Sequence, residues 1–212
     1  MLTTFRREYL DEQLRSTQFR GDVLDIGGKK IKKRGRFRPP THGINSWRYV
    51  NVDASTDPDY CCDAGTIPLP DKSVDCVLLC EVLEHLKHPE QAIAEAARLL
   101  KPGGRIIISM PFLYAVHADP DDFERWTPSR FREVLRRLGF EQPSVEPMGG
   151  IVAVIFDLLV CAMQRWRRSL MRSIAVRCLV YVRSLARWLD RRTSASTRDV
   201  ATTGYWITAA RN

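Results

Sequence analysis

An apolar run, a helical pattern and a second apolar run follow one another in the middle of the chain. Residues 74–80 are apolar except for Asp75, residues 89–100 place apolar side chains on one helical face, and residues 105–109 are rich in isoleucine. The first run is too short for a buried helix, so this order is typical of two parallel strands joined by a helix. Neither run alternates with polar residues, which predicts helices on both faces of a parallel sheet.

Similar patterns extend the predicted sheet on both sides of this unit. We expect helices at residues 4–18 and 128–138, strands at 22–26, 49–53, 140–147 and 204–210, and a short strand that ends at Asp63. Thr127 suits the N-cap of the later helix, and Pro128 suits its first position. The chain is therefore predicted to be a single α/β domain over residues 1–212. Its doubly wound sheet is expected to have seven strands, most of them parallel.

Cysteine usage and the N-terminus bear on where the protein works. The six cysteines form no Cys-x-x-Cys pair, and four of them sit in or beside predicted strands. This pattern favours buried, reduced thiols over zinc ligands or disulfides. The first residues lack the apolar core of a signal peptide. We therefore expect a cytoplasmic protein without a metal site.

The basic charge is concentrated in two segments. The net charge is +8, and residues 164–192 contain nine arginines with Asp190 as their single acidic residue, a surplus that equals the whole net charge. Residues 29–38 form a second basic cluster directly after two glycines. This second cluster is either a solvated loop or an electropositive rim that attracts a phosphate-bearing substrate.

Residues 151–192 form a basic helical insertion between the sixth and seventh predicted strands. Residues 151–163 are apolar except for Asp157, but this run is too short to span a bilayer, which takes about 20 residues. From Trp166 onward, apolar residues recur at helical spacing with arginines on the other faces, as in helices that lie in a membrane interface. One interpretation is attachment to an anionic membrane surface at the inner face of the membrane. The other is a basic helix that covers the sheet or contacts a partner protein.

Five short motifs occur in the order and spacing of one known family. They are Val-Leu-Asp-Ile-Gly-Gly at 23–28, Asn-Val-Asp at 51–53, Cys-Asp-Ala at 62–64, Glu-Val-Leu-Glu-His at 81–85 and Leu-Lys-Pro-Gly-Gly at 100–104. Together they resemble the class I S-adenosylmethionine-dependent methyltransferases, most closely the small-molecule "type 11" group, over roughly residues 20–140. The resemblance implies a Rossmann-like methyltransferase fold, S-adenosylmethionine as the cofactor, and an antiparallel seventh strand between strands five and six.

The same resemblance implies which residues bind the cofactor. A carboxylate at a strand end can accept hydrogen bonds from both ribose hydroxyls, which is the role implied for Asp53. The implied cofactor-binding set is Asp25, Gly27, Gly28, Asp53, Asp63, Ala64, Cys80 and Glu81. The chain departs from the family pattern after Gly28, where two lysines stand before any third glycine. This departure predicts a basic loop in place of most or all of the usual helix. The leading helix at 4–18 either packs over the cofactor site or simply covers a face of the sheet.

The segment after the fifth strand carries the candidate catalytic group. Residues 110–128 resemble a loop pattern of methyltransferases that are frequent in bacterial surface-polysaccharide gene sets. A histidine can accept a proton near neutral pH because its ordinary pKa is about 6.5. We predict His117 as the catalytic base and Asp122, Arg125 and Trp126 as substrate-binding residues. Alternatively, Asp122 and Arg125 pair to fix the loop, and His117 bonds only to backbone.

The sequence therefore predicts an enzyme that transfers a methyl group from S-adenosylmethionine to a hydroxyl of a small molecule, sugar or lipid-linked glycan. Two alternatives stay open. The basic surface is compatible with RNA methylation, although no Asn/Asp-Pro-Pro-aromatic motif follows the fourth strand and nucleic acid is the less favoured partner. The missing third glycine is compatible with an assembly subunit that binds the cofactor without turning it over.

Overall fold

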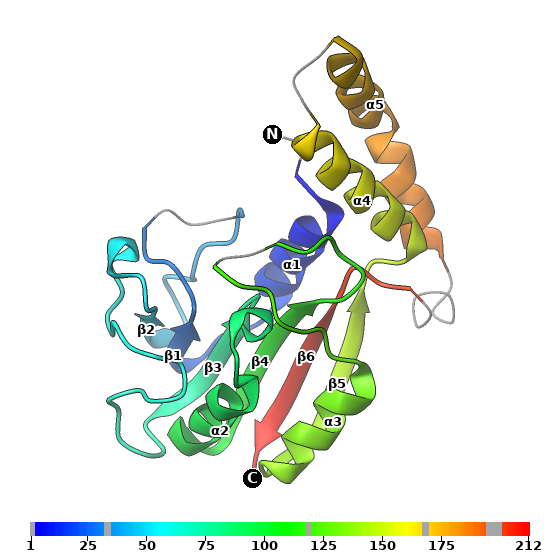
Figure 1. Ribbon diagram of the computed structural model, residues 1–212. Helices are drawn as coiled ribbons and strands as arrows, with labels where there is room; N and C mark the ends of the chain where they lie inside the picture. Colours follow the sequence, from blue (N-terminus) through cyan, green and yellow to red (C-terminus); the bar gives the residue numbers. More distant parts are fainter. Residues whose placement is uncertain (1–2, 32–34, 118–119, 167–169, 194–200) are drawn as a thin grey trace.

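A single twisted sheet forms the centre of the molecule, for which we use a computed structural model that describes residues 3–31, 35–117, 120–166, 170–193 and 201–212 (Figure 1). Among these residues the sheet has six strands in the order β2-β1-β3-β4-β6-β5. The strands are β1 (Gly21–Ile26), β2 (Ile44–Val50), β3 (Val74–Cys80), β4 (Leu100–Pro111), β5 (Phe140–Met148) and β6 (Gly204–Arg211). The first four run parallel, and β6 lies antiparallel between β4 and β5, as the resemblance implied.

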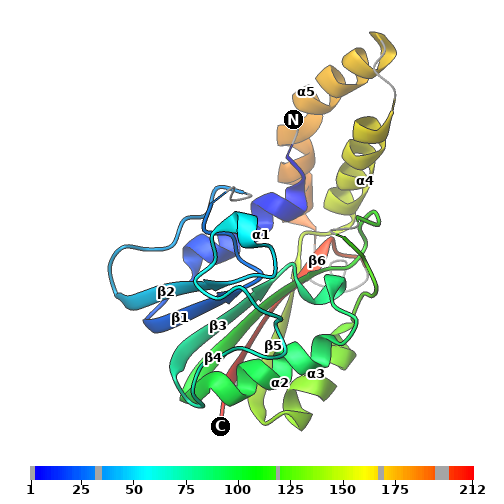
Figure 2. The same cartoon turned by 60° about the vertical axis from the view of Figure 1, so that its left-hand side comes forward.

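Helices cover both faces of the sheet, which makes the domain doubly wound. The helices are α1 (Phe5–Ser16), α2 (Pro89–Leu99), α3 (Pro128–Arg137), α4 (Ile151–Arg165) and α5 (Leu170–Arg192), with two short 3-10 turns, η1 (Ala54–Thr56) and η2 (Leu83–His85). Helices α2 and α3 bury their apolar faces in one core cluster with Val77, Leu79 and Ile106. Helix α1 packs on the opposite face, where Leu10 and Leu14 meet a second cluster (Figure 2).

The number of strands and the position of one strand differ from the prediction. The expected short strand before Asp63 is reduced to an isolated bridge between Val50 and Tyr60. Here the Asp59 carboxylate accepts a hydrogen bond from the Tyr49 amide at 2.8 Å, so a side chain takes the place of part of a strand ladder. The second strand covers residues 44–50 and not 49–53. Its outer half mixes polar with apolar residues because it lies at the edge of the described sheet, and this mixture hid it in the sequence.

The segment after the glycine turn matches its prediction. Residues 27–31 and 35–43 contain no helix and form a basic loop between β1 and β2. The buried Asp11 carboxylate of α1 accepts hydrogen bonds from the amides of Arg36 at 2.8 Å and Phe37 at 3.3 Å, which ties this loop to α1. Lys32, Lys33 and Arg34 of the predicted cluster lie outside the described residues.

The insertion folds as a helical hairpin of α4 and α5 that projects beyond the sheet and joins α1 (Figures 1 and 2). Its two acidic residues hold it there. Asp157 accepts the backbone amides of Phe5 at 2.6 Å and Arg6 at 2.9 Å. Asp190 accepts the Tyr9 hydroxyl at 2.7 Å and caps the start of α4 through its backbone amides. No helix among the described residues is both long and apolar enough to cross a membrane.

Candidate active site

A tight glycine turn after β1 forms the floor of the candidate site. Gly27 has φ +79°, and a Cβ at this position would lie 2.2 Å from a Val82 methyl group. A Cβ on Gly28 would meet the Asp25 carboxylate at 2.4 Å. The Asn51 amide holds the turn by donating to the Gly27 and Gly28 carbonyls at 3.1 and 3.0 Å. Because only glycine fits here, the backbone stays open to a ligand.

A cavity of about 550 Å³ lies over this turn at the carboxyl ends of β1, β2 and β3. In an open parallel sheet this is the end at which ligands bind. Six of the predicted cofactor residues and the predicted base line it together: Asp25, Gly27, Gly28, Asp53, Cys80, Glu81 and His117. Helix α1 contributes Arg6, Arg7, Asp11 and Leu14 to the wall, so it both covers the sheet face and closes the cavity.

Glu81 and Arg6 form a buried ion pair in the cavity wall, between the end of β3 and α1. Glu81 has φ +59°, a strained value for a residue with a side chain. Its amide donates to the Ser109 carbonyl at 2.9 Å, and its carboxylate accepts the Ser109 hydroxyl at 3.3 Å. The Arg6 guanidinium also lies 4.1 Å from the centre of the Tyr114 ring. Sequence reasoning missed Arg6, although a charged residue beside the apolar Phe5 of an amphipathic helix was a usable signal.

Asp53 and Asp63, both members of the implied cofactor-binding set, lie in different environments. Asp53 lines the cavity, and its carboxylate also accepts the Ser55 amide at 2.9 Å, which caps η1. The Asp63 carboxylate accepts the Gly65 amide at 2.7 Å, and neither Asp63 nor Ala64 lines the cavity as described. Ala64 is buried in the core cluster on the α2 side. Cofactor binding by Asp63 and Ala64 stays a prediction.

The loop after β4 places His117 at the cavity and fixes it from behind. The Asp122 carboxylate accepts the His117 amide at 2.9 Å and forms a two-pronged ion pair with Arg125. This pairing is the alternative that the sequence left open, and it lowers the pKa of Asp122 to about 2. Trp126 is 3% exposed, packs on Phe131 and donates to Glu124, so it belongs to the core. A substrate-binding role for these three residues stays a prediction.

His117 is neutral and half-buried. Burial, followed by the nearby Arg6 charge, lowers the pKa of His117 to about 4. Its Nδ1 lies 3.3 Å from the Ala115 carbonyl oxygen. A carbonyl oxygen can only accept, so Nδ1 carries the proton and Nε2 presents a lone pair. The ring therefore has the protonation state that a general base needs.

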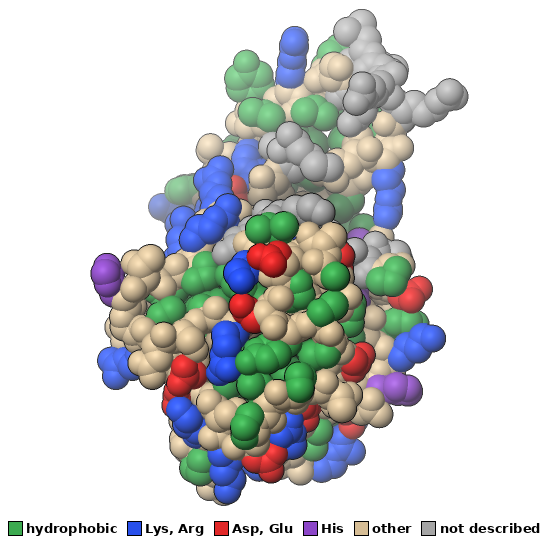
Figure 3. All heavy atoms as spheres, turned by 90° about the vertical axis from the view of Figure 1, so that its left-hand side faces the viewer, with side chains coloured by type: hydrophobic (Ala, Val, Ile, Leu, Met, Phe, Trp, Pro, Cys, Tyr) green, Lys and Arg blue, Asp and Glu red, His purple; other side chains and the backbone are tan. Residues whose placement is uncertain are grey.

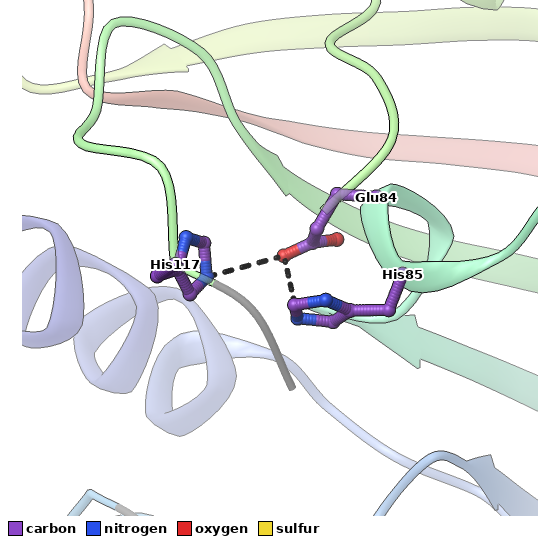
Figure 4. A group of neighbouring side chains, drawn as sticks. All are labelled: Glu84, His85 and His117. Carbon is purple, nitrogen blue, oxygen red and sulfur yellow. Dashed lines mark ion pairs between the residues drawn. The ribbon is translucent and has the colours of Figure 1, made fainter. Parts of the chain in front are cut away.

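Two further groups that sequence reasoning did not assign to the site lie beside His117. Glu84 and His85 come from η2, and Figure 4 shows both side chains turned toward His117. Glu84 is 0% exposed, and burial raises its pKa. His85 lines the cavity, and its Nδ1 lies 2.5 Å from the Asp121 carbonyl oxygen. An acidic residue inside the apolar stretch from Val82 to Leu86 was the available signal for Glu84.

The sheet order, the glycine turn and the cavity at the carboxyl ends of the strands define a Rossmann-like methyltransferase fold. Solved structures share it. The [4+2]-cyclase SpnF superposes with a TM-score of 0.57 at 18% identity, covering 95% of this chain and 79% of that one. An S-adenosylmethionine-dependent methyltransferase from Archaeoglobus fulgidus gives a TM-score of 0.55 at 17% identity, covering 97% and 94%. Likeness at this identity shows the fold.

Sequence comparison agrees with the fold over part of the chain. A family model described as "Methyltransferase domain" matches residues 42–108. The ubiquinone/menaquinone biosynthesis C-methyltransferase UbiE of Pseudomonas fluorescens is 44% identical over 87 residues, which are 41% of this chain and 30% of that protein. The chain spans less than half the length of the curated relatives it matches first. Residues 42–108 therefore match a methyltransferase domain, and the fold around them is that of S-adenosylmethionine-dependent methyltransferases.

Proposed function

We propose that the protein transfers a methyl group from S-adenosylmethionine to a hydroxyl of a small molecule or glycan. This proposal rests on one observation: the glycine turn, Asp53 and a neutral His117 line the same cavity. A volume of about 550 Å³ suits a nucleoside-sized ligand together with part of an acceptor. Gly27 and Gly28 line this cavity, and a Cβ at either position would collide with Val82 or with the Asp25 carboxylate, so the turn requires glycine.

Carboxylates in the cavity wall suit this positively charged donor. Asp25 and Asp53 line the cavity, as do Asp11, which accepts the amides of Arg36 and Phe37, and Glu81, which pairs with Arg6. Asp53 would hold the ribose hydroxyls, and Asp25 and the glycine turn would hold the methionine end. When bound, S-adenosylmethionine supplies an electrophilic methyl carbon on a positively charged sulfur. The chain's own contribution is then to align an acceptor oxygen with that carbon and to exclude water, which accounts for most of the rate in such transfers.

His117 is placed to handle the proton of the acceptor. The acceptor oxygen forms a bond to the methyl carbon while the carbon–sulfur bond breaks and its electron pair returns to sulfur. The hydroxyl proton passes to His117 Nε2, the ring atom that carries no proton in the folded protein. Asp122 and Arg125 act through His117 by fixing its backbone, so they are positioning residues.

The hairpin supports a proposal about where the acceptor is found. Its apolar side chains Ile155, Ile174, Tyr181, Leu185 and Trp188 are exposed, and Tyr181 is 84% exposed. Figure 3 shows exposed apolar and basic side chains on the projecting part of the molecule. Such a surface suits an anionic membrane interface. We therefore propose peripheral attachment at the inner face of the membrane, with a lipid-linked glycan as the acceptor class.

Carbon methylation is a second candidate, favoured by one observation. The curated relative UbiE, which matches 41% of this chain, is a C-methyltransferase by its name. An RNA substrate receives less support, because Arg183, Arg187 and Arg191 of the basic helix pair with Glu8 and Glu12 of α1 and are drawn away from a nucleic acid surface. A cofactor-binding subunit without activity remains the third outcome to test.

Product mass spectrometry after incubation with isotope-labelled S-adenosylmethionine separates these functions. The protein is supplied in parallel with extracted lipid-linked glycans, quinone precursors and RNA. Label on a glycan oxygen supports the proposal, and label on a ring carbon supports the second candidate. Calorimetric binding of S-adenosylhomocysteine without label in any acceptor would favour the subunit without activity. Loss of both binding and label would overturn the assignment of the cavity.

A further inference from the structure

The carboxylate of Glu84 is buried without a partner. Its side chain is 0% exposed, and neither carboxylate oxygen has a hydrogen-bond partner among the described residues. A buried carboxylate in this state is costly unless a proton or a cation balances it. The nearby charges already pair elsewhere, since Arg6 pairs with Glu81 and Arg125 with Asp122. Glu84, which lies behind His85 and His117 and not in the cavity lining, is therefore a buried charge without a matching partner.

The two neighbouring histidines direct their acceptor nitrogens toward this carboxylate. Nε2 of His85 lies 3.7 Å and Nε2 of His117 lies 3.9 Å from Glu84 Oε1 (Figure 4). In both rings Nδ1 faces a backbone carbonyl oxygen, of Asp121 and Ala115 respectively. Each Nδ1 must then be the donor, so neither neutral ring has an Nε2 proton to give to Glu84. The separations are also too long for hydrogen bonds.

We propose that Glu84, His85 and His117 bind a divalent transition-metal ion such as Zn²⁺ through one carboxylate oxygen and two Nε2 atoms. These three ligand atoms lie within 4.8 Å of one another. A tetrahedral ion with bonds of about 2.1 Å separates its ligands by about 3.4 Å, so closing by a few tenths of an ångström brings the carboxylate to both rings. Histidines that bind metal commonly donate their other ring N–H to a carbonyl, which is the arrangement seen here.

The chemical types of the three ligands limit which metal ions the site would bind. Two imidazoles and one carboxylate favour zinc, iron, cobalt or nickel over magnesium and calcium, which prefer oxygen ligands alone. Three protein ligands leave a coordination position open, as in catalytic metal sites. His85 and His117 line the cavity, so an ion held by them would be reached from the cavity.

The role of the ion rests on the proposed function. In the metal-loaded protein His117 Nε2 is a ligand, and the ion takes over its task by lowering the pKa of the acceptor hydroxyl. The hydroxyl proton is then released to water, the oxygen gains the methyl group, and the electron pair of the broken carbon–sulfur bond stays on sulfur. The ion keeps its charge throughout, so the step needs no oxidant or reductant.

Metal titration tests the site without reference to turnover. Chelator-treated protein is titrated with Zn²⁺ against a chromophoric competitor, and Co²⁺ is added separately to record its visible absorption spectrum. We expect one ion per chain. Glu84→Gln and His85→Ala should each weaken Zn²⁺ binding by about 100-fold or more, at least as much as the loss of a group that only supports a ligand. His42→Ala, which changes an exposed histidine far along the chain from these ligands, is the matched control.

The outcomes separate this site from the proposed function. Equal Zn²⁺ affinity of the wild type, Glu84→Gln and His85→Ala would overturn the metal site and assign Glu84 to a protonated, neutral state. If Glu84→Gln does not fold, His85→Ala and His117→Ala give the same answer from more exposed positions. If the protein binds S-adenosylhomocysteine and transfers methyl groups but does not bind Zn²⁺, only the metal site is disproved. If it binds Zn²⁺ stoichiometrically but does not bind S-adenosylhomocysteine, only the proposed function is disproved.

Discussion

The backbone amide of Arg6 donates a hydrogen bond to the Asp157 carboxylate at 2.9 Å, although 151 positions separate the two residues. The Arg6 side chain continues from there to the ion pair with Glu81 in the cavity wall. A residue of the inserted hairpin therefore fixes the start of α1, and α1 in turn forms part of the candidate active site. The insertion is thus linked to the site by two consecutive interactions.

Replacing Asp157 should loosen α1 and weaken ligand binding together. Asp157→Ala leaves the buried amides of Phe5 and Arg6 without an acceptor, which costs about 1–3 kcal/mol for each unsatisfied group. We expect a lower free energy of unfolding in urea, faster hydrogen exchange over residues 5–16 and weaker S-adenosylhomocysteine binding. Ser184→Ala, an exposed change on α5, is the control. Unchanged exchange in α1 would show that the hairpin contributes nothing to the cavity wall.

Asp53 is expected to dominate the affinity for the nucleoside part of the donor. Asp53→Ala removes an acceptor for charge-assisted hydrogen bonds worth roughly 1.5–3 kcal/mol each, so S-adenosylhomocysteine should bind about tenfold more weakly or worse. Asp53→Asn is the companion variant, because it keeps an oxygen that can cap η1 through the Ser55 amide. Isothermal titration calorimetry measures both. Affinity within twofold of wild type for Asp53→Ala would mean that the ribose lies elsewhere.

His117→Ala should lower turnover by about 100-fold or more, while S-adenosylhomocysteine affinity stays nearly constant. The reason is the same with or without a metal ion, because the variant loses either the base or a ligand of the ion that replaces it. Single-turnover kinetics with labelled donor report the chemical step directly. His42→Ala again serves as the control. An unchanged single-turnover rate would leave His117 with a structural role only.

Asp122 should stabilise the fold in a pH-dependent way. Its pKa is lowered to about 2 by the hydrogen bonds from Arg125, so between about pH 4 and pH 2 the unfolded chain binds a proton that the folded protein does not. The stabilisation is therefore complete above about pH 4 and is lost as the pH falls toward about 2. Asp122→Asn should lower the free energy of unfolding by ~2 kcal/mol near pH 7.

Denaturant titrations of both proteins at several pH values measure this difference. The gap between wild type and Asp122→Asn should stay constant from about pH 7 to pH 5 and narrow below about pH 4. Asp121→Asn is the neighbouring control, since the Asp121 backbone carbonyl and not its carboxylate faces His85. If the difference in free energy of unfolding is equally large at all pH values, the effect of Asp122→Asn comes from altered packing and not from the lost charge.

The hairpin should bind vesicles through its exposed aromatic residues. Burying a large apolar side chain in the headgroup boundary contributes roughly 1.5–3 kcal/mol, so Tyr181→Ser with Trp188→Ser should lower vesicle binding at least about tenfold. Binding should strengthen with anionic lipid and weaken with salt. Phe123→Ser changes an exposed aromatic residue outside the hairpin and is the control. Equal recovery with neutral and anionic vesicles at low salt would make the hairpin a cover for α1 alone.

The arginines that carry the charge in this prediction fall into two groups. Arg183, Arg187 and Arg191 pair with acidic residues of α1 and contribute little to lipid binding. Arg177 and Arg192 are exposed on the same helix. Arg167 and Arg168 lie outside the described residues. Changing Arg177 to Gln should therefore reduce the salt dependence of vesicle binding more than changing Arg187 to Gln.

Local pattern predicted the buried strand β3 and the capped, amphipathic helix α3. Residues 74–80 form β3 as expected because that strand is covered on both faces. Thr127 caps α3 by accepting the Arg130 amide, as its side chain and the following proline predicted. The second strand was misplaced because an edge strand mixes polar with apolar residues. The expectation of six buried cysteines was also too simple, since Cys61 and Cys178 are exposed free thiols.

Contacts between distant segments could not be predicted in this way. Glu84 and His117 are brought together only when the loop after β4 folds back onto η2, where the Phe123 amide donates to the Glu84 carbonyl at 2.8 Å. The same holds for Asp157 and Asp190, which read as isolated acids in apolar or basic helices and are in fact acceptors for backbone amides of other segments. The hydrophobic pattern of one helix or strand does not show which residues of another segment will contact it.

The hairpin stands where a much shorter connection would serve. Strands β5 and β6 are antiparallel neighbours, and such a pair can be joined by a turn of a few residues. A short turn in place of residues 151–192 would therefore be compatible with the same pairing of β5 and β6. A lineage that gained or lost this segment would keep its fold but change the wall contributed by α1. The position of α1 at the cavity and the apolar surface that the hairpin exposes would then change together, as one inherited unit.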